Sequence, residues 1–115
     1  MNDEMIKVKR ANTTRKKMNA KQLKEYLEGV TRFQEGERWG LRVKDDIIAK
    51  PIYSHISSFE GDYAVCAIGR QRFLYGILDR RGNIILPMEY ESVYLIGGHR
   101  ASVTKVHGFP KDIEL

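Results

Sequence analysis

Three histidines and one cysteine are the residues whose types could do metal or nucleophilic chemistry in this chain. His55, His99 and His107 lack metal-binding spacing, and Cys66 has no second cysteine with which to form a disulfide or a shared site. A zinc site needs three or four converging ligands. We therefore expect no metal, no cofactor and no enzymatic activity.

Cys66 alternates with Ala64 inside residues 62–68, which have the apolar character of a strand. A cysteine in such a place is more often a small buried hydrophobic residue than a nucleophile. A lone cysteine also fits a reducing compartment, so we expect a cytoplasmic protein. No apolar run approaches the roughly 18 residues that span a bilayer. The first residues also lack the basic and apolar segments of a secretory signal, and we expect no membrane contact.

The basic residues carry the main functional signal. The net charge is +5, yet residues 1–24 hold eight Lys or Arg against two acidic residues, and residues 25–115 hold twelve against thirteen. This asymmetry predicts an anionic partner, because lysine and arginine neutralise phosphates and release counterions. The candidate binding residues are Lys7, Lys9, Arg10, Arg15, Lys16, Lys17, Lys21, Lys24, Arg70, Arg72, Arg80, Arg81 and Arg100.

A competing interpretation of these cations stays open. Residues 1–18 would then be a flexible solubilising arm, and the arginines would be exposed strand residues. The arm has no aromatic residue, so any nucleic acid would be held by its backbone and not by its bases. Trp39 and Tyr75 could stack on a ligand, but aromatic residues at repeated positions are more typical of a core.

One short helix is predicted at residues 19–29. Asn19 can cap its start, with Gln22 three residues later as in a capping box. An apolar stripe at helical spacing follows, and because so short a helix is marginal alone, this stripe should dock on the rest of the domain. The stripe consists of Leu23, Tyr26, Leu27 and Val30.

Beyond the helix, three short segments return 36 or 37 residues later. They are Trp39-Gly40-Leu41 with Tyr75-Gly76-Ile77, Pro51-Ile52-Tyr53 with Pro87-Met88-Glu89-Tyr90, and Ala64-Val65-Cys66 with Ala101-Ser102-Val103. Such a period is typical of a repeat architecture, in which one unit cannot bury its apolar face alone. Both copies consist of strand-like segments joined by turns, which predicts antiparallel hairpins.

The two copies lead to three detailed predictions. Pro51 and Pro87 end the second strand of their copies, because proline cannot donate to a ladder. The spacing grows from 36 to 37 after the prolines, which places one inserted residue within residues 88–89. Gly82 should adopt a left-handed turn conformation, and Asp46 stands at the matching position of the first copy.

This pattern resembles the WG (KWG) repeat of bacterial proteins over about residues 33–107. The resemblance implies a β-rich binding or scaffold module whose motif has no catalytic residues. Residues 33–36 resemble the tail of a preceding unit, and residues 106–109 resemble the start of a following unit that Pro110 ends. The matching residues are Trp39, Gly40, Leu41, Pro51, Tyr53, Ile56, Phe59, Gly61, Ala64 and Cys66 in the first copy, and Tyr75, Gly76, Ile77, Asp79, Gly82, Pro87, Tyr90, Val93, Ala101 and Val103 in the second.

We therefore predict a flexible basic arm at residues 1–18 and one mainly β, antiparallel hairpin-repeat domain at residues 19–115, with copies at about 37–68 and 73–106. The function expected is a non-enzymatic interaction module for a larger protein or ribonucleoprotein partner. An accessory or inhibitor protein of a bacterial mobile element or phage would suit this description. The alternative is an RNA- or DNA-contacting protein that uses the arm and the arginines. The oligomeric state stays open.

Overall fold

The computed structural model describes residues 18–115, so nearly all of the predicted arm lies outside the described residues. Within these described residues one helix, α2 (Ala20–Glu28), precedes nine strands in two antiparallel sheets of order β1-β2-β3 and β4-β5-β6-β7-β8-β9. The mainly β, antiparallel class is confirmed. The strands are β1 (Thr31–Glu35), β2 (Arg38–Val43), β3 (Asp46–Tyr53), β4 (His55–Ile56), β5 (Tyr63–Ile68), β6 (Leu74–Asp79), β7 (Ile84–Gly97), β8 (Arg100–Lys105) and β9 (Lys111–Glu114).

The helix begins with the predicted capping box. The Asn19 side chain accepts from the Gln22 amide at 2.8 Å, and the Asn19 amide donates to the Gln22 side chain at 3.1 Å. Tyr26 and Leu27 pack against the neighbouring core, and Val30 is buried in it. The Tyr26 hydroxyl also donates to Asp46 at 2.7 Å, which ties the helix to the start of β3.

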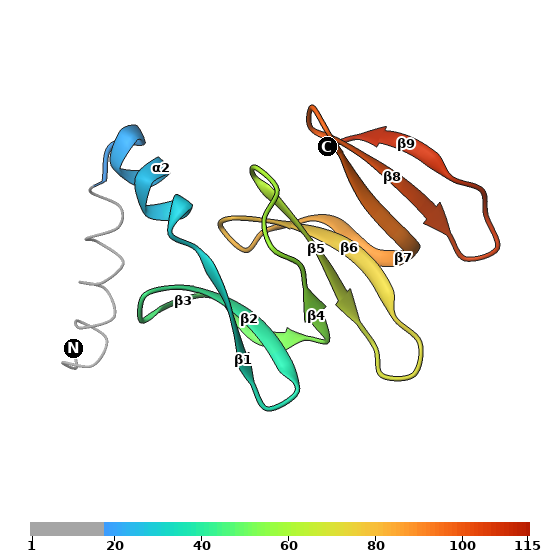
Figure 1. Cartoon of the computed structure of the whole chain (residues 1–115), viewed down its shortest axis with the longest axis horizontal. Helices are drawn as coiled ribbons and strands as arrows, with labels where there is room; N and C mark the ends of the chain where they lie inside the picture. Colours follow the sequence, from blue (N-terminus) through green and yellow to red (C-terminus); the bar gives the residue numbers. More distant parts are fainter. Residues whose placement is uncertain (1–17) are drawn as a thin grey trace, which may run out of the picture.

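The strands form three successive layers along an elongated molecule of 52 × 32 × 22 Å (Figure 1). We call β1–β3 the first layer, β4–β6 with the start of β7 the second, and the rest of β7 with β8 and β9 the third. The long strand β7 is shared because it pairs with β6 in the second layer and with β8 in the third.

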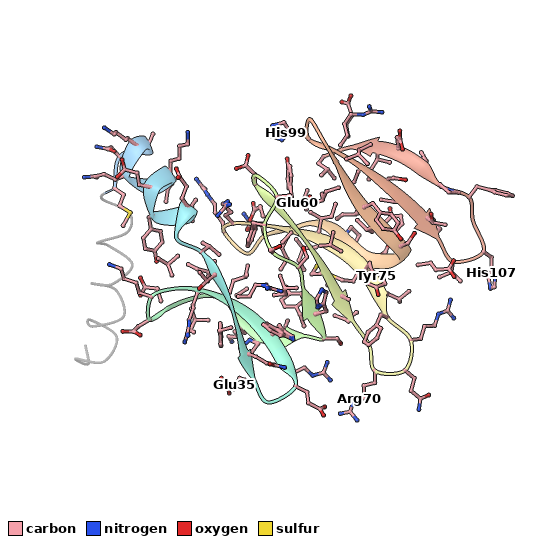
Figure 2. The ribbon with its side chains drawn as sticks, in the orientation of Figure 1. Glu35, Glu60, Arg70, Tyr75, His99 and His107 are labelled. Atoms are coloured by element: carbon pink, nitrogen blue, oxygen red, sulfur yellow. The ribbon has the colours of Figure 1, made fainter. Side chains whose placement is uncertain are left out.

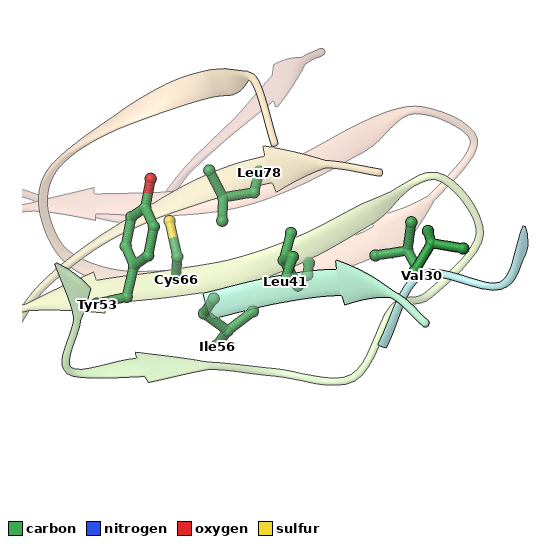
Figure 3. Packing of buried hydrophobic residues seen from close by; sticks show 8 residues of the cluster. Val30, Leu41, Tyr53, Ile56, Cys66 and Leu78 are labelled. Atoms are coloured by element: carbon green, nitrogen blue, oxygen red, sulfur yellow. The ribbon is translucent and has the colours of Figure 1, made fainter. Parts of the chain in front are cut away.

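Two cores fill the spaces between these layers. The first contains Leu41 and Tyr53 from the first layer, together with Ile56, Cys66 and Leu78 from the second (Figure 3). The second core contains residues of the second and third layers: Ile77, Leu86, Val93, Ala101 and Val103. Alternate residues of a strand face opposite sides, so β5 and β6 supply both cores.

The hairpins β2–β3 and β6–β7 share the same irregular register. In the first, Leu41 faces Ala49 and Trp39 faces Tyr53, so two residues of β2 oppose four of β3. In the second, Ile77 faces Leu86 and Tyr75 faces Tyr90 with the same mismatch.

The prolines lie within these irregularities, and the prediction that they end their strands is wrong. Pro51 is inside β3 and Pro87 is inside β7. A bulge frees residues from the ladder, so a residue that lacks an amide proton is tolerated there.

The predicted site of the inserted residue, at Met88 or Glu89, is also wrong. Arg42 pairs with Ile47 and Leu78 pairs with Ile84, so the second hairpin is already one residue longer at its turn. An extra residue in an exposed turn leaves the ladder intact, whereas one in the strand would shift the register.

The left-handed turn position of the first hairpin is Lys44 (φ 52°), and the prediction of Asp46 is wrong. Gly82 has the expected positive φ of 81°.

The flanking fragments complete the outer layers. β1 pairs with β2 as β5 pairs with β6, which agrees with residues 33–36 being the tail of a unit. Residues 106–109 lie outside any strand, and β9 begins after Pro110 and pairs with β8. Pro110 therefore does not abort the following unit; the strand begins just beyond it.

Candidate interaction groove

A groove of about 610 Å³ lies between α2, the β4–β5 turn and the β6–β7 turn. Leu23 and Leu27 of the helix and Ile85 of β7 supply its large aliphatic side chains. Ile85 remains 39% exposed, and Leu23, the first residue of the helix stripe, lies outside the buried core. The groove therefore presents an apolar surface that residues 18–115 leave uncovered.

Arg80 forms the wall of the groove between the helix and the second layer. Its guanidinium donates to the carbonyl of Leu27 at 3.1 Å and to that of Gly61 at 2.8 Å, and it lies 4.8 Å from the ring of Phe59. A helix C-terminus has carbonyls without helical partners, and a cation there also meets the negative end of the helix dipole. This candidate binding residue is thus engaged in holding the helix in place.

The turn that carries Arg80 is fixed by Asp79. One Asp79 carboxylate oxygen accepts from the amides of Arg81 and Asn83, both at 2.9 Å, and the other accepts from the Asn83 side chain at 3.1 Å. Such an Asx turn holds the backbone without outside help. Because Asp79 is used in this way, the exposed charges around the groove are those of Lys24, Glu28, Asp62 and Arg81.

The predicted cations fall into separate groups. Lys24, Arg80 and Arg81 line the groove, and Lys21 is exposed on the same helix. Arg70 and Arg72 lie in the β5–β6 loop, at the opposite end of β6 from Arg80 and Arg81. Arg70 is also far from Arg100, since Figure 2 shows Arg70 and His99, the neighbour of Arg100 in the sequence, at opposite edges of the molecule. Arg100 lies 3.5 Å from Asp112 in an exposed ion pair. Lys7, Lys9, Arg10, Arg15, Lys16 and Lys17 lie outside the described residues.

The remaining chemistry-bearing residues have structural surroundings. Cys66 is fully buried, and burial raises the pKa of its thiol to about 12. The Nδ1 atom of His99 lies 2.9 Å from the Tyr63 hydroxyl oxygen, and both residues line a second cavity. Trp39 is half-buried against the first core, with the Arg32 guanidinium 5.4 Å from its ring. Within residues 18–115, no three His, Cys, Asp or Glu side chains are grouped as metal ligands.

The groove contains three large aliphatic residues that the sequence did not single out as binding residues: Leu23, Leu27 and Ile85. A signal for Ile85 was present, since adjacent Ile84 and Ile85 begin a strand and must point to opposite faces. One of these two faces lines the groove only because α2 lies beside it, and no local pattern specifies the position of α2.

The fold and its uncovered groove define a class of protein: a small, layered β-hairpin repeat protein. Residues 75–97 match the family model described as WG containing repeat, in agreement with the resemblance seen in the sequence. No curated protein and no solved structure matches the chain significantly. None of the helices in the described part of the chain is long and apolar enough to cross a membrane.

Proposed function

We propose that this chain is a non-enzymatic interaction module and that a short apolar segment of a partner protein binds the groove between α2 and the second layer. The observation that carries the proposal is the aliphatic lining of the groove, half-buried Leu23 and Leu27 with exposed Ile85, beside charges of both signs. Protein interfaces combine an apolar centre with a polar rim. A nucleic acid would instead favour a uniformly basic rim.

The mixed rim also describes the partner. Lys24 and Arg81 stand against Glu28 and Asp62, and none of these four side chains is held in a salt bridge within residues 18–115. The segment that binds would therefore place an aliphatic or aromatic side chain in the groove and polar groups of both signs around it. We infer that the module acts in the bacterial cytoplasm, as an accessory or inhibitor protein of a mobile element or phage would.

Two adjacent residues provide a matched test. Ile85→Lys introduces a charge into the groove, and Ile84→Lys introduces the same charge one residue away, at a position that is 51% exposed and does not line it. Full-length chains carrying each substitution are used to capture partners from the native host, with capture quantified by mass spectrometry. Ile85→Lys should abolish capture of a protein that the unaltered chain and Ile84→Lys both retain.

The nucleic-acid alternative is an outcome of the same test. Binding of generic RNA and duplex DNA is measured by fluorescence anisotropy at about 50 and 200 mM salt, where phosphate contacts lose affinity steeply. Salt-sensitive binding to nucleic acid, with protein capture unaffected by Ile85→Lys, would replace the protein-groove proposal with the nucleic-acid one.

A further inference from the structure

Consecutive layers of this protein meet through equivalent positions at both internal junctions. At the first junction Leu41 of β2 and Leu78 of β6 share one core, and at the second Ile77 of β6 and Ile113 of β9 share the other. Leu41 and Ile77 thus face the following layer, and we call theirs the forward position. Leu78 and Ile113 face the preceding layer, and we call theirs the backward position.

The two positions are adjacent in one strand of every layer: β2, β6 and β9, which are equivalent because they pair in the same way with the strand before them. A forward residue is followed at once by a backward residue, so the two side chains point to opposite faces. The pairing supports this equivalence, because each backward residue lies opposite a small residue of the preceding strand: Thr31, Ala64 and Ala101. The forward–backward pairs are Leu41–Arg42, Ile77–Leu78 and Asp112–Ile113.

The two outer faces of the molecule therefore carry opposite charges at matching positions. Arg42 occupies the backward position of the first layer, where no preceding layer exists in the described chain. Asp112 occupies the forward position of the third layer, and both residues are exposed. Stacking the third layer of one copy on the first layer of another would bring Asp112 against Arg42. At each internal junction, the same two positions hold a pair of aliphatic side chains.

We propose that copies of this chain associate head to tail through these faces, with Asp112 of one copy paired to Arg42 of the next. The residues aligned with these charges supply apolar area. Ile47, which pairs with Arg42 across the hairpin, is 50% exposed. Tyr94, which lies opposite Ser102 in the row of Asp112, is 66% exposed.

The existing partners of the two charges do not prevent this pairing. Asp112 meets Arg100 at 3.5 Å with both side chains about half exposed, and exposed pairs of this kind contribute little. The Arg42 guanidinium lies 5.2 Å from the ring of Phe33, and this contact with a ring face leaves its edges free to donate to a carboxylate.

The geometry of the contact determines the kind of assembly. Two different faces meet, so the contact is heterologous, and repeating it extends a chain of copies and does not close a symmetric dimer. Association is weak and reversible, because a charge pair near solvent replaces the aliphatic contact of the internal junctions. It should also weaken with salt, which screens exposed charges.

Sedimentation of the full chain from micromolar to millimolar concentration tests the proposal. At low salt the average mass should rise with concentration past that of a dimer, and it should fall in high salt. Arg42→Glu and Asp112→Lys should each keep the chain monomeric, and the double variant should associate again because the charges are exchanged. Arg70→Glu makes the same charge change in the β5–β6 loop, away from both faces, and should leave association unchanged.

A chain that stays monomeric at every concentration would overturn the proposal, and Arg42 and Asp112 would then be polar caps that prevent stacking. Loss of association in Arg70→Glu, or a failure of the double variant to recover it, would overturn it as well. Thermal unfolding of each variant shows that it is folded. The outcome is independent of the groove, because Ile85 lies on neither face.

Discussion

The Cys66 side chain is buried between the first and second layers, with its sulfur 3.4 Å from that of Met88. The sequence pattern predicted a small buried hydrophobic residue, and the structure confirms it. Burial raises the pKa of the thiol from 9.0 to about 12. Burial also raises the pKa of the Tyr53 hydroxyl, and the charge of Cys66 raises it further. The same strand position is occupied by Val103 in the second core, which shows that the site needs an apolar side chain and not a thiol.

Alkylation of Cys66 tests this residue-level conclusion. The thiolate is the reactive form, so the native chain should resist iodoacetamide at about pH 8, and concentrated urea should make it react fully. Mass spectrometry measures the modified fraction. The fold favours the neutral thiol, so the raised pKa also makes the free energy of unfolding depend on pH. The stabilisation is fully present below pH 9.0, the ordinary pKa of the thiol, and is lost as pH rises towards the folded-state pKa of about 12. Equal alkylation rates with and without urea would contradict the buried position.

At the scale of elements, the hairpin irregularity explains the glycine of the repeat. A Cβ at Gly40 would lie 2.5 Å from the carbonyl oxygen of Ala49 and 2.9 Å from the nitrogen of Pro51. A Cβ at Gly76 would overlap the carbonyl of Leu86 in the same way and lie 2.9 Å from the nitrogen of Met88. Neither glycine has a positive φ, so the requirement is space for the bulged strand opposite.

Gly76→Ala should therefore destabilise the protein by roughly 3 kcal/mol or more, since the methyl group meets backbone that cannot move without breaking the hairpin. Gly36→Ala is the matched control. Its Cβ would meet nothing within 4 Å, and only its φ of 61° opposes the change, at a cost of about 1–2 kcal/mol. Urea unfolding followed by circular dichroism gives both values. A smaller loss for Gly76→Ala than for Gly36→Ala would show that the bulged strand yields to the methyl group.

At the scale of the whole molecule, each layer needs its neighbour. The first core is built from the first and second layers, and the second core from the second and third, so no layer buries its apolar face alone. The helix closes one side of the first core through Tyr26 and Leu27. Arg80 of the second layer holds the end of that helix, which joins segments more than fifty residues apart.

Arg80→Ala should lower the free energy of unfolding by about 1–3 kcal/mol, because it removes the donor for the Leu27 and Gly61 carbonyls. Arg81→Ala is the control, since its exposed side chain has no partner among the described residues and its amide still donates to Asp79. Arg81→Ala should change the free energy of unfolding by no more than about 0.5 kcal/mol. Equal stability of the two variants in urea would mean that the helix is held by its apolar contacts alone.

The amino-acid sequence alone determined the class of this protein: it contains a capping pattern at Asn19, segments that recur after 36 or 37 residues, and an alternation that predicts burial of Cys66. These signals need only the order of residues along the chain, since capping and alternation depend on neighbours and the repeat depends on the recurrence of such short segments. Only the tertiary structure decided where the prolines and the extra turn residue lie, because register depends on the opposite strand. It also decided that Arg80 supports the helix while Leu23 and Ile85 line a groove. Those roles arise from contacts between segments far apart in sequence, which no local spacing specifies.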